Sequence, residues 1–221
     1  MNHYLLKNDY TKAGVPPILN AVLAEHFNEK DPMPPMAGYS WTKTRDPNRE
    51  YPKDLFLISK DKSYKFDYIK FWEGYVISKK FKEKIDNFDL SYKSVNLKVI
   101  GWKNNKITEK EYFFIDVPSS NSIDCINYDE SSFELDKQMI ELRGLKESKI
   151  IKEKNYYGNI KAYDSLVLSK EIKNNIFRVK DNTILDLVCS ENFKQELLND
   201  NIYGIDFISF DQMNTYHNYF R

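Results

Sequence analysis

The spacing of apolar residues predicts one helix near the N-terminus and strands over much of the remaining chain. Behind Pro16 and Pro17, apolar side chains recur at helical intervals; they are Ile18, Leu19, Val22, Leu23 and Phe27. This spacing puts them on one face of a helix that ends before Pro32. Short apolar runs bounded by turn residues predict strands at 4–6, 55–58, 64–69, 71–77, 95–99, 107–117, 123–126 and 205–210.

A local pattern of strand, serine and amphipathic helix occurs three times, at Ser78, Ser169 and Ser190. In each copy, apolar residues follow the serine three and seven positions later, on one helical face. A serine in this place can accept a hydrogen bond from a backbone N–H of the first turn. We therefore expect three helix N-caps. No base recurs at a fixed offset from these serines, so the pattern indicates scaffold and no chemistry.

Interleaved strands and short helices with many hairpin signals predict an α+β fold with a mainly antiparallel sheet. At 221 residues the chain is long enough for one well-buried core. We expect a single domain over 1–221. It comprises an N-terminal helix and Pro-rich loop (1–53), a core (54–210) and a tail (211–221).

Net charge narrows the classes of partner. The chain carries 33 basic and 33 acidic residues and only five arginines, so a basic footprint for nucleic acid is absent. Cys125 and Cys189 lie in apolar, strand-like contexts, which predicts buried, reduced thiols. The first ten residues are polar and mixed, and no apolar run approaches a membrane span. We expect a cytoplasmic protein that binds neither nucleic acid nor membrane.

Catalytic and metal-binding signatures are missing from the sequence. His3, His26 and His217 are far apart and lack metal-ligand neighbours at short spacing. We find no glycine-rich phosphate loop and no nucleophile signature. We expect no catalytic residues, metal or cofactor. Two alternatives stay open: a small enzyme that uses a carboxylate pair, and a nucleic-acid module that stacks bases on Tyr and Phe.

Residues for a protein partner are concentrated between Asp31 and Pro52. This Pro-rich loop carries side chains of the types that dominate interface hot spots, namely Tyr39, Trp41, Arg45, Arg49 and Tyr51. Trp41 either anchors a partner or covers the sheet as a lid. Asp129 and Glu130 form an acidic turn that suits a basic partner. Trp72 and Trp102 fall in predicted strands and are expected in the core.

The scaffold motifs carry a family resemblance. They are Leu57-Ile58-Ser59-Lys60, Phe66-Asp67-Tyr68, residues 74–85, 95–102 and 110–117, and the ending Cys189-Ser190, Phe193, Leu197 and 204–208. Over roughly residues 54 to 210 the chain resembles the immunity proteins of bacterial polymorphic toxin systems, in particular the immunity protein 43 family, with similarity to a related larger immunity family. The resemblance implies a protein that binds the C-terminal domain of a cognate toxin and blocks it by occlusion.

Overall fold

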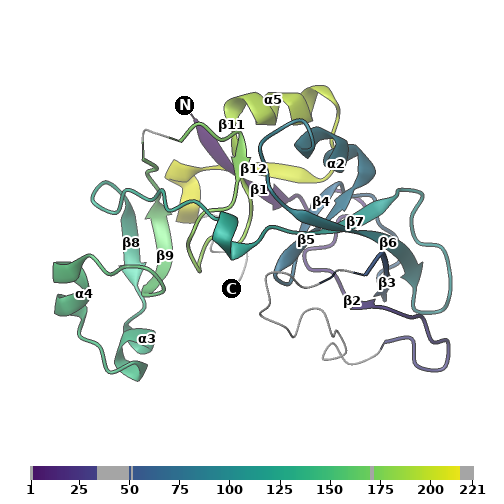
Figure 1. Cartoon of the computed structure of the whole chain (residues 1–221), viewed down its shortest axis with the longest axis horizontal. Helices are drawn as coiled ribbons and strands as arrows, with labels where there is room; N and C mark the ends of the chain where they lie inside the picture. The colour runs from purple at the N-terminus through teal and green to yellow at the C-terminus, as the bar shows by residue number, and fades with distance from the viewer. Residues whose placement is uncertain (1, 34–49, 51, 170–171, 215–221) are drawn as a thin grey trace. The chain divides into compact units, whose positions relative to one another are not determined.

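The computed structural model describes residues 2–33, 50, 52–169 and 172–214 (Figure 1). The chain divides into two compact units. The first unit consists of Met1–Leu6, Pro118–Gln195 and Phe207–Arg221, and the second of Lys7–Val117 and Glu196–Asp206. The single-domain organisation expected from the sequence stays a prediction.

The second unit is built on a six-stranded sheet with the order β2-β3-β6-β7-β5-β4. Its strands are β2 (Ala21–Ala24), β3 (Asp54–Ser59), β4 (Tyr68–Phe71), β5 (Gly74–Ser78), β6 (Lys93–Gly101) and β7 (Tyr112–Asp116). Neighbouring strands are antiparallel, except that β3 and β6 are parallel. In β6, Val95 and Leu97 are buried while Asn96 and Lys98 are exposed, which is the alternation that the sequence predicts.

Aromatic rings fill the core of the second unit. Phe66 lies with its ring centroid 5.2 Å from Tyr64 and 5.0 Å from Tyr112. The Tyr112 hydroxyl donates a hydrogen bond of 2.8 Å to the Phe66 carbonyl oxygen, so its buried polar atom is satisfied. These rings bury large apolar areas, and this explains the high aromatic content of the chain.

A four-stranded sheet with the order β10-β11-β1-β12 belongs mostly to the first unit, which also contains a two-stranded ribbon, β8-β9. These strands are β1 (His3–Asn8), β10 (Ile176–Phe177), β11 (Val188–Ser190), β12 (Ile205–Ser209), β8 (Ser132–Leu135) and β9 (Ile160–Ser165). The helices among the described residues are α2 (Lys79–Ile85), α3 (Lys137–Leu142), α4 (Glu147–Glu153) and α5 (Glu191–Asn199), with 3-10 turns η2 (Ser119–Asn121) and η3 (Phe210–Gln212). Short helices with mainly antiparallel sheets confirm the α+β class.

The predicted N-terminal helix is wrong. Residues 21–24 form β2, which pairs with β3 so that Val22 lies opposite Ile58. All four residues of β2 are buried, whereas Ile18, expected on the same helical face, is 75% exposed. Pairing with β3 satisfies the backbone of this apolar run, and the tertiary contact overrides the local periodicity.

The helix predicted after Ser169 is also wrong within the described chain. Residues 172–175 are irregular, and Ile176 begins β10, where it pairs with Cys189 of β11. Asn174 and Asn175 are weak helix formers. The Asn175 carbonyl oxygen instead accepts the Ser190 N–H at 2.8 Å. Ser169 therefore caps no helix among the described residues.

The other two serines lie at helix N-termini. Ser78 Oγ accepts the Phe81 N–H at 3.2 Å, and Ser190 Oγ accepts the Phe193 N–H at 3.3 Å. Ser190 Oγ also donates to Asn175 Oδ1 at 2.7 Å. Both serines are buried, so a lost hydroxyl is not replaced easily by water.

We expect Ser78→Ala and Ser190→Ala each to lower the free energy of unfolding by about 0.5–2 kcal/mol, because each leaves a first-turn N–H without its acceptor. Denaturant titration measures this change. Ser63→Ala is the matched control, since Ser63 is exposed and lies at no helix terminus; it should stay within about 0.5 kcal/mol of the parent. Equal effects at all three sites would contradict the capping role.

Candidate functional site

An exposed tryptophan occupies the turn of the β4–β5 hairpin. Phe71 pairs with Gly74, so Trp72 and Glu73 form a two-residue turn. The backbone of Trp72 has a positive φ of 56°, and Trp72 is 60% exposed. Glycine or asparagine is usual at such a position, and a bulky side chain there is strained. The expectation that Trp72 belongs to the core is wrong, because the turn carries it out of the sheet.

Trp102 lies immediately after β6, where it is 41% exposed. Its ring lies 5.1 Å from Lys103 Nζ, in cation–π contact. The core assignment is wrong here too. The strand register places the two tryptophans at opposite ends of the sheet. Lys93, the first residue of β6, lies opposite Asp116, which is at the end of the sheet that carries Trp72. Trp102 follows the last residue of β6 and therefore lies at the other end. The nine residues of β6 separate these ends by about 30 Å.

A helical hairpin, defined here as residues 136–159, connects β8 to β9 in the first unit. It contains α3 and α4, which lie at one end of the β8–β9 ribbon (Figure 1). Among the described residues, eleven large hydrophobic side chains are exposed, and five of them belong to this hairpin: Met139, Leu142, Leu145, Ile151 and Tyr157. No other segment of similar length in the described ranges exposes as many.

A half-open cavity of about 510 Å³ lies in the first unit. Its lining includes His3, Ser209 and Asp211 together with residues 166–169. The His3 ring packs edge-on against Phe177, at 5.7 Å between centroids, and Ser209 Oγ donates to Asp211. His3 is the one histidine among the described residues of this lining.

Both cysteines are free and buried, as the sequence predicts. Burial, together with the Asp124 carboxylate, raises the pKa of the Cys125 thiol to about 12. Burial also raises the pKa of Cys189. Because the thiolate is the nucleophile, neither residue is suited to nucleophilic attack at neutral pH. The described ranges hold no group of three or more His, Cys, Asp or Glu side chains placed to bind a metal ion.

Of the partner-binding residues predicted from the sequence, five lie outside the described residues: Tyr39, Trp41, Arg45, Arg49 and Tyr51. Asp129 is exposed and paired with Lys154 at 2.6 Å, and Glu130 lies beside it in the same exposed turn. Asp124 is paired with Lys180 at 3.5 Å. Two of the three carboxylates in this region are therefore neutralised locally, which weakens their attraction for a basic partner.

Basic residues on α2 are also paired. Lys82 binds Asp86 at 2.7 Å, Lys79 lies 3.3 Å from Glu111, and Lys84 contacts Asp200. Within the second unit the lysine run thus forms a solvated, charge-balanced helix face. No helix in the part of the chain described is both long and apolar enough to cross a membrane.

Sequence reasoning missed Trp72 and the exposed side chains of the helical hairpin. The signal for Trp72 is the glycine two residues later, since Trp72-Glu73-Gly74 is a turn between two apolar runs. The signal for the hairpin is Gly144 between two short apolar groups, which divides the segment into two helices. Neither signal reveals exposure, because that depends on which face meets the core.

Comparison with known proteins assigns the chain to a protein family. The family model described as Immunity protein 43 matches residues 7–220, nearly the whole chain. No curated protein matches. The match includes the scaffold motifs as well as the segments that precede and follow them. The chain therefore belongs to the immunity protein 43 family.

Proposed function

We propose that this protein neutralises a cognate bacterial toxin by binding the toxin's C-terminal domain and covering its active surface. The observation that carries the proposal is the family match over residues 7–220. Occlusion requires a rigid surface that presents anchoring side chains, and it requires no chemistry by the inhibitor. We place this action in the cytoplasm of the producing bacterium.

Features of both units support binding over catalysis. Exposed Trp72 and Trp102 are carried on a well-packed sheet, and tryptophan is prominent among interface hot spots. The strain at Trp72 favours a role in recognition, because strained residues tend to occur at functional sites. The Pro-rich loop and the acidic turn at Asp129 and Glu130 remain proposed additional contacts.

The test uses the toxin encoded beside the gene for this chain. Expression of that toxin's C-terminal domain should stop bacterial growth, and co-expression of this protein should restore it. With purified proteins, the toxin's activity should fall linearly and reach zero at about one equivalent of inhibitor, because occlusion is stoichiometric.

An enzymatic mode of protection would give a different titration. If a small fraction of an equivalent inactivated all of the toxin over time, this protein would be turning over, and occlusion would be wrong. If growth were not restored and no complex formed, the proposed function itself would fail. A toxin domain from an unrelated system is the specificity control, and it should be neither bound nor inhibited.

A further inference from the structure

The helical hairpin is exposed along almost its whole length. Between residues 137 and 155, only Ile140 and Ile150 are buried, at 4% and 2% exposure, and all the others are exposed. Helices of six and seven residues are marginal in water by themselves. The hairpin nevertheless exposes five apolar side chains to solvent. This exposure is energetically unfavourable, and burial against a partner would remove the cost.

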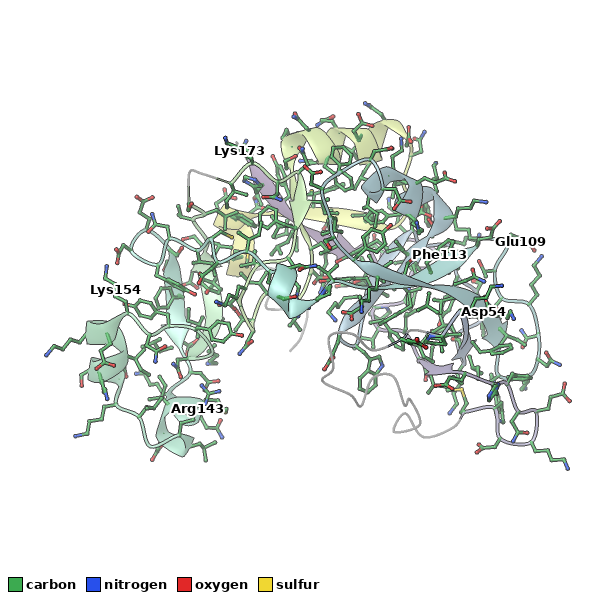
Figure 2. All side chains as sticks on the ribbon, viewed as in Figure 1. Asp54, Glu109, Phe113, Arg143, Lys154 and Lys173 are labelled. Atoms are coloured by element: carbon green, nitrogen blue, oxygen red, sulfur yellow. The ribbon has the colours of Figure 1, made fainter. Side chains whose placement is uncertain are left out.

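The base of the hairpin is held firmly. Arg143 Nη1 donates to the Gly158 carbonyl oxygen at 2.8 Å and to Asn159 Oδ1 at 3.0 Å. Asn159 is buried, and its Nδ2 donates to the Asn155 carbonyl oxygen at 3.0 Å. The Asp136 N–H donates to the Asn159 carbonyl oxygen at 2.8 Å. Figure 2 shows Arg143 together with the side chains of this segment. An element fixed in this way loses little entropy on binding.

The connection is long for its place in the fold. The 24 residues between Leu135 and Ile160 join two antiparallel strands. Hairpin strands are commonly joined by about 2–5 residues, and long insertions tend to be functional. The fold of the first unit does not require this length, so the insertion is free to serve recognition.

The charge of the hairpin indicates the chemistry of its partner. Residues 136–159 include six basic and four acidic side chains in a chain that is neutral as a whole. Lys149 and Lys154 have acidic neighbours, at 3.9 Å from Glu153 and 2.6 Å from Asp129. Lys137, Lys146 and Lys152 are exposed and form no ion pair with any described residue. The surface therefore combines apolar anchors with an excess of positive charge.

We propose that the helical hairpin inserts into an apolar recess with an acidic rim on the cognate toxin domain. The proposal rests on the proposed function and deepens it. A second copy of this chain is disfavoured as the occupant, because two such surfaces would bring like charges together. Nucleic acid is disfavoured as well. Of the five exposed apolar side chains of the hairpin, Tyr157 alone is aromatic, and bases stack on aromatic rings.

The first test removes the apolar anchors. Leu142→Ser/Ile151→Ser should weaken binding to the C-terminal domain of the toxin encoded beside this gene, made inactive for the assay, by about 30-fold or more. Thermal unfolding should be nearly unchanged, because Leu142 is 73% exposed, Ile151 is 51% exposed, and Ile140 and Ile150 are kept. The matched control is Leu198→Ser on α5, where the leucine is 50% exposed; it should bind as the parent does.

The second test reverses charge. Lys146→Glu/Lys152→Glu should slow association with the same toxin domain by about 10-fold at low salt, and the difference should shrink at high salt. Lys62→Glu/Lys65→Glu has the same net charge, with both changes at exposed positions of the second unit, and should slow association far less. This comparison separates local complementarity from overall charge, and it stays decisive even where the serine variant unfolds.

The outcomes separate this inference from the function on which it rests. If the parent protein neither binds nor inhibits the toxin domain, the proposed function fails. If the parent binds while both hairpin variants bind equally well, the hairpin is not the docking element. Two further results would overturn the assignment. The first is that the parent protein forms dimers and the Leu142→Ser/Ile151→Ser variant does not. The second is that the hairpin binds vesicles of phosphatidylglycerol while its substitutions leave the toxin affinity unchanged.

Discussion

Asp67→Ala is expected to lower the free energy of unfolding of the second unit by about 3 kcal/mol. Asp67 is 1% exposed. Its carboxylate accepts the Tyr203 N–H at 2.6 Å and an ammonium proton of Lys110 at 2.5 Å. Alanine would leave both donors without this acceptor. The Lys110 side chain is 33% exposed and water can reach it, so we expect the lower end of the range for broken buried pairs.

The loss should be felt across several elements, because Asp67 connects them. Its N–H donates to the Tyr203 carbonyl oxygen at 2.9 Å, and its carbonyl oxygen accepts the Ser78 N–H at 3.0 Å. Alanine keeps these two main-chain bonds but loses the side-chain bond to the Tyr203 N–H, so the segment 196–206 is held less firmly against the sheet near the start of α2. We expect proteolysis within this segment to accelerate in the variant.

Denaturant unfolding of matched variants measures the effect. Asp67→Asn keeps an acceptor for the Tyr203 N–H while removing the charge, so it should cost less than alanine. Glu111→Ala removes an exposed partner of Lys79 and should change stability by less than about 1 kcal/mol. If Asp67→Ala cost no more than Glu111→Ala, the network at Asp67 would not be a stabilising one.

The strands β3 and β6 and the helices α2 and α5 could be predicted because local and tertiary preferences agree there. In β6, alternating apolar and polar residues match a sheet with one buried face. At Ser78 and Ser190, the cap residue and the apolar positions that follow specify the same helix. Where the two levels agree, one sequence is sufficient to locate the element.

The prediction fails where tertiary contacts decide. Val22 and Leu23 fit a helical face, but a short apolar run fits a fully buried strand equally well, and pairing with β3 selects the strand. At Asn175, hydrogen bonds to Ser190 replace the helix that the apolar spacing suggests. Partners so distant in sequence are invisible to local patterns.

The exposed surfaces could be predicted even less well. Ile140 and Leu142 are both apolar residues of α3, yet one is 4% exposed and the other 73%. Nothing in the local sequence distinguishes a residue that packs against the core from one that faces solvent. The hot-spot residues predicted in the Pro-rich loop were chosen by residue type, and they stay predictions.

Above about pH 10, the free energy of unfolding is expected to fall steeply because of three buried tyrosines. Burial raises the pKa of Tyr64, Tyr112 and Tyr163. The nearby carboxylates of Asp61, Asp67 and Asp181, respectively, raise these pKa values further. In the unfolded chain these phenols ionise near pH 10. Between that pH and the higher pKa of the native state, the unfolded chain binds fewer protons, so rising pH favours it. Each tyrosine should contribute about 1.4 kcal/mol of lost stability per pH unit.

Substitution of single tyrosines isolates this effect from the titration of lysines. Tyr64→Phe removes the hydroxyl that lies 2.5 Å from Ser59 Oγ and 2.7 Å from Asp61 Oδ2, and it should cost about 1 kcal/mol near pH 7. The same variant cannot ionise at this position, so its deficit should shrink as the pH rises above 10 and reverse near pH 11. Denaturant midpoints from pH 8 to pH 11 measure the crossing.

Phe66→Leu is the control for core packing, because Phe66 contacts Tyr64 and Tyr112 but carries no titrating group. Its deficit should be the same at every pH, since only the volume of the core changes. If Tyr64→Phe showed a constant deficit as well, Tyr64 would ionise at the same pH in both states. Burial of the phenol would then place no cost on its anion, and the alkaline limit of this fold would have to arise from other groups.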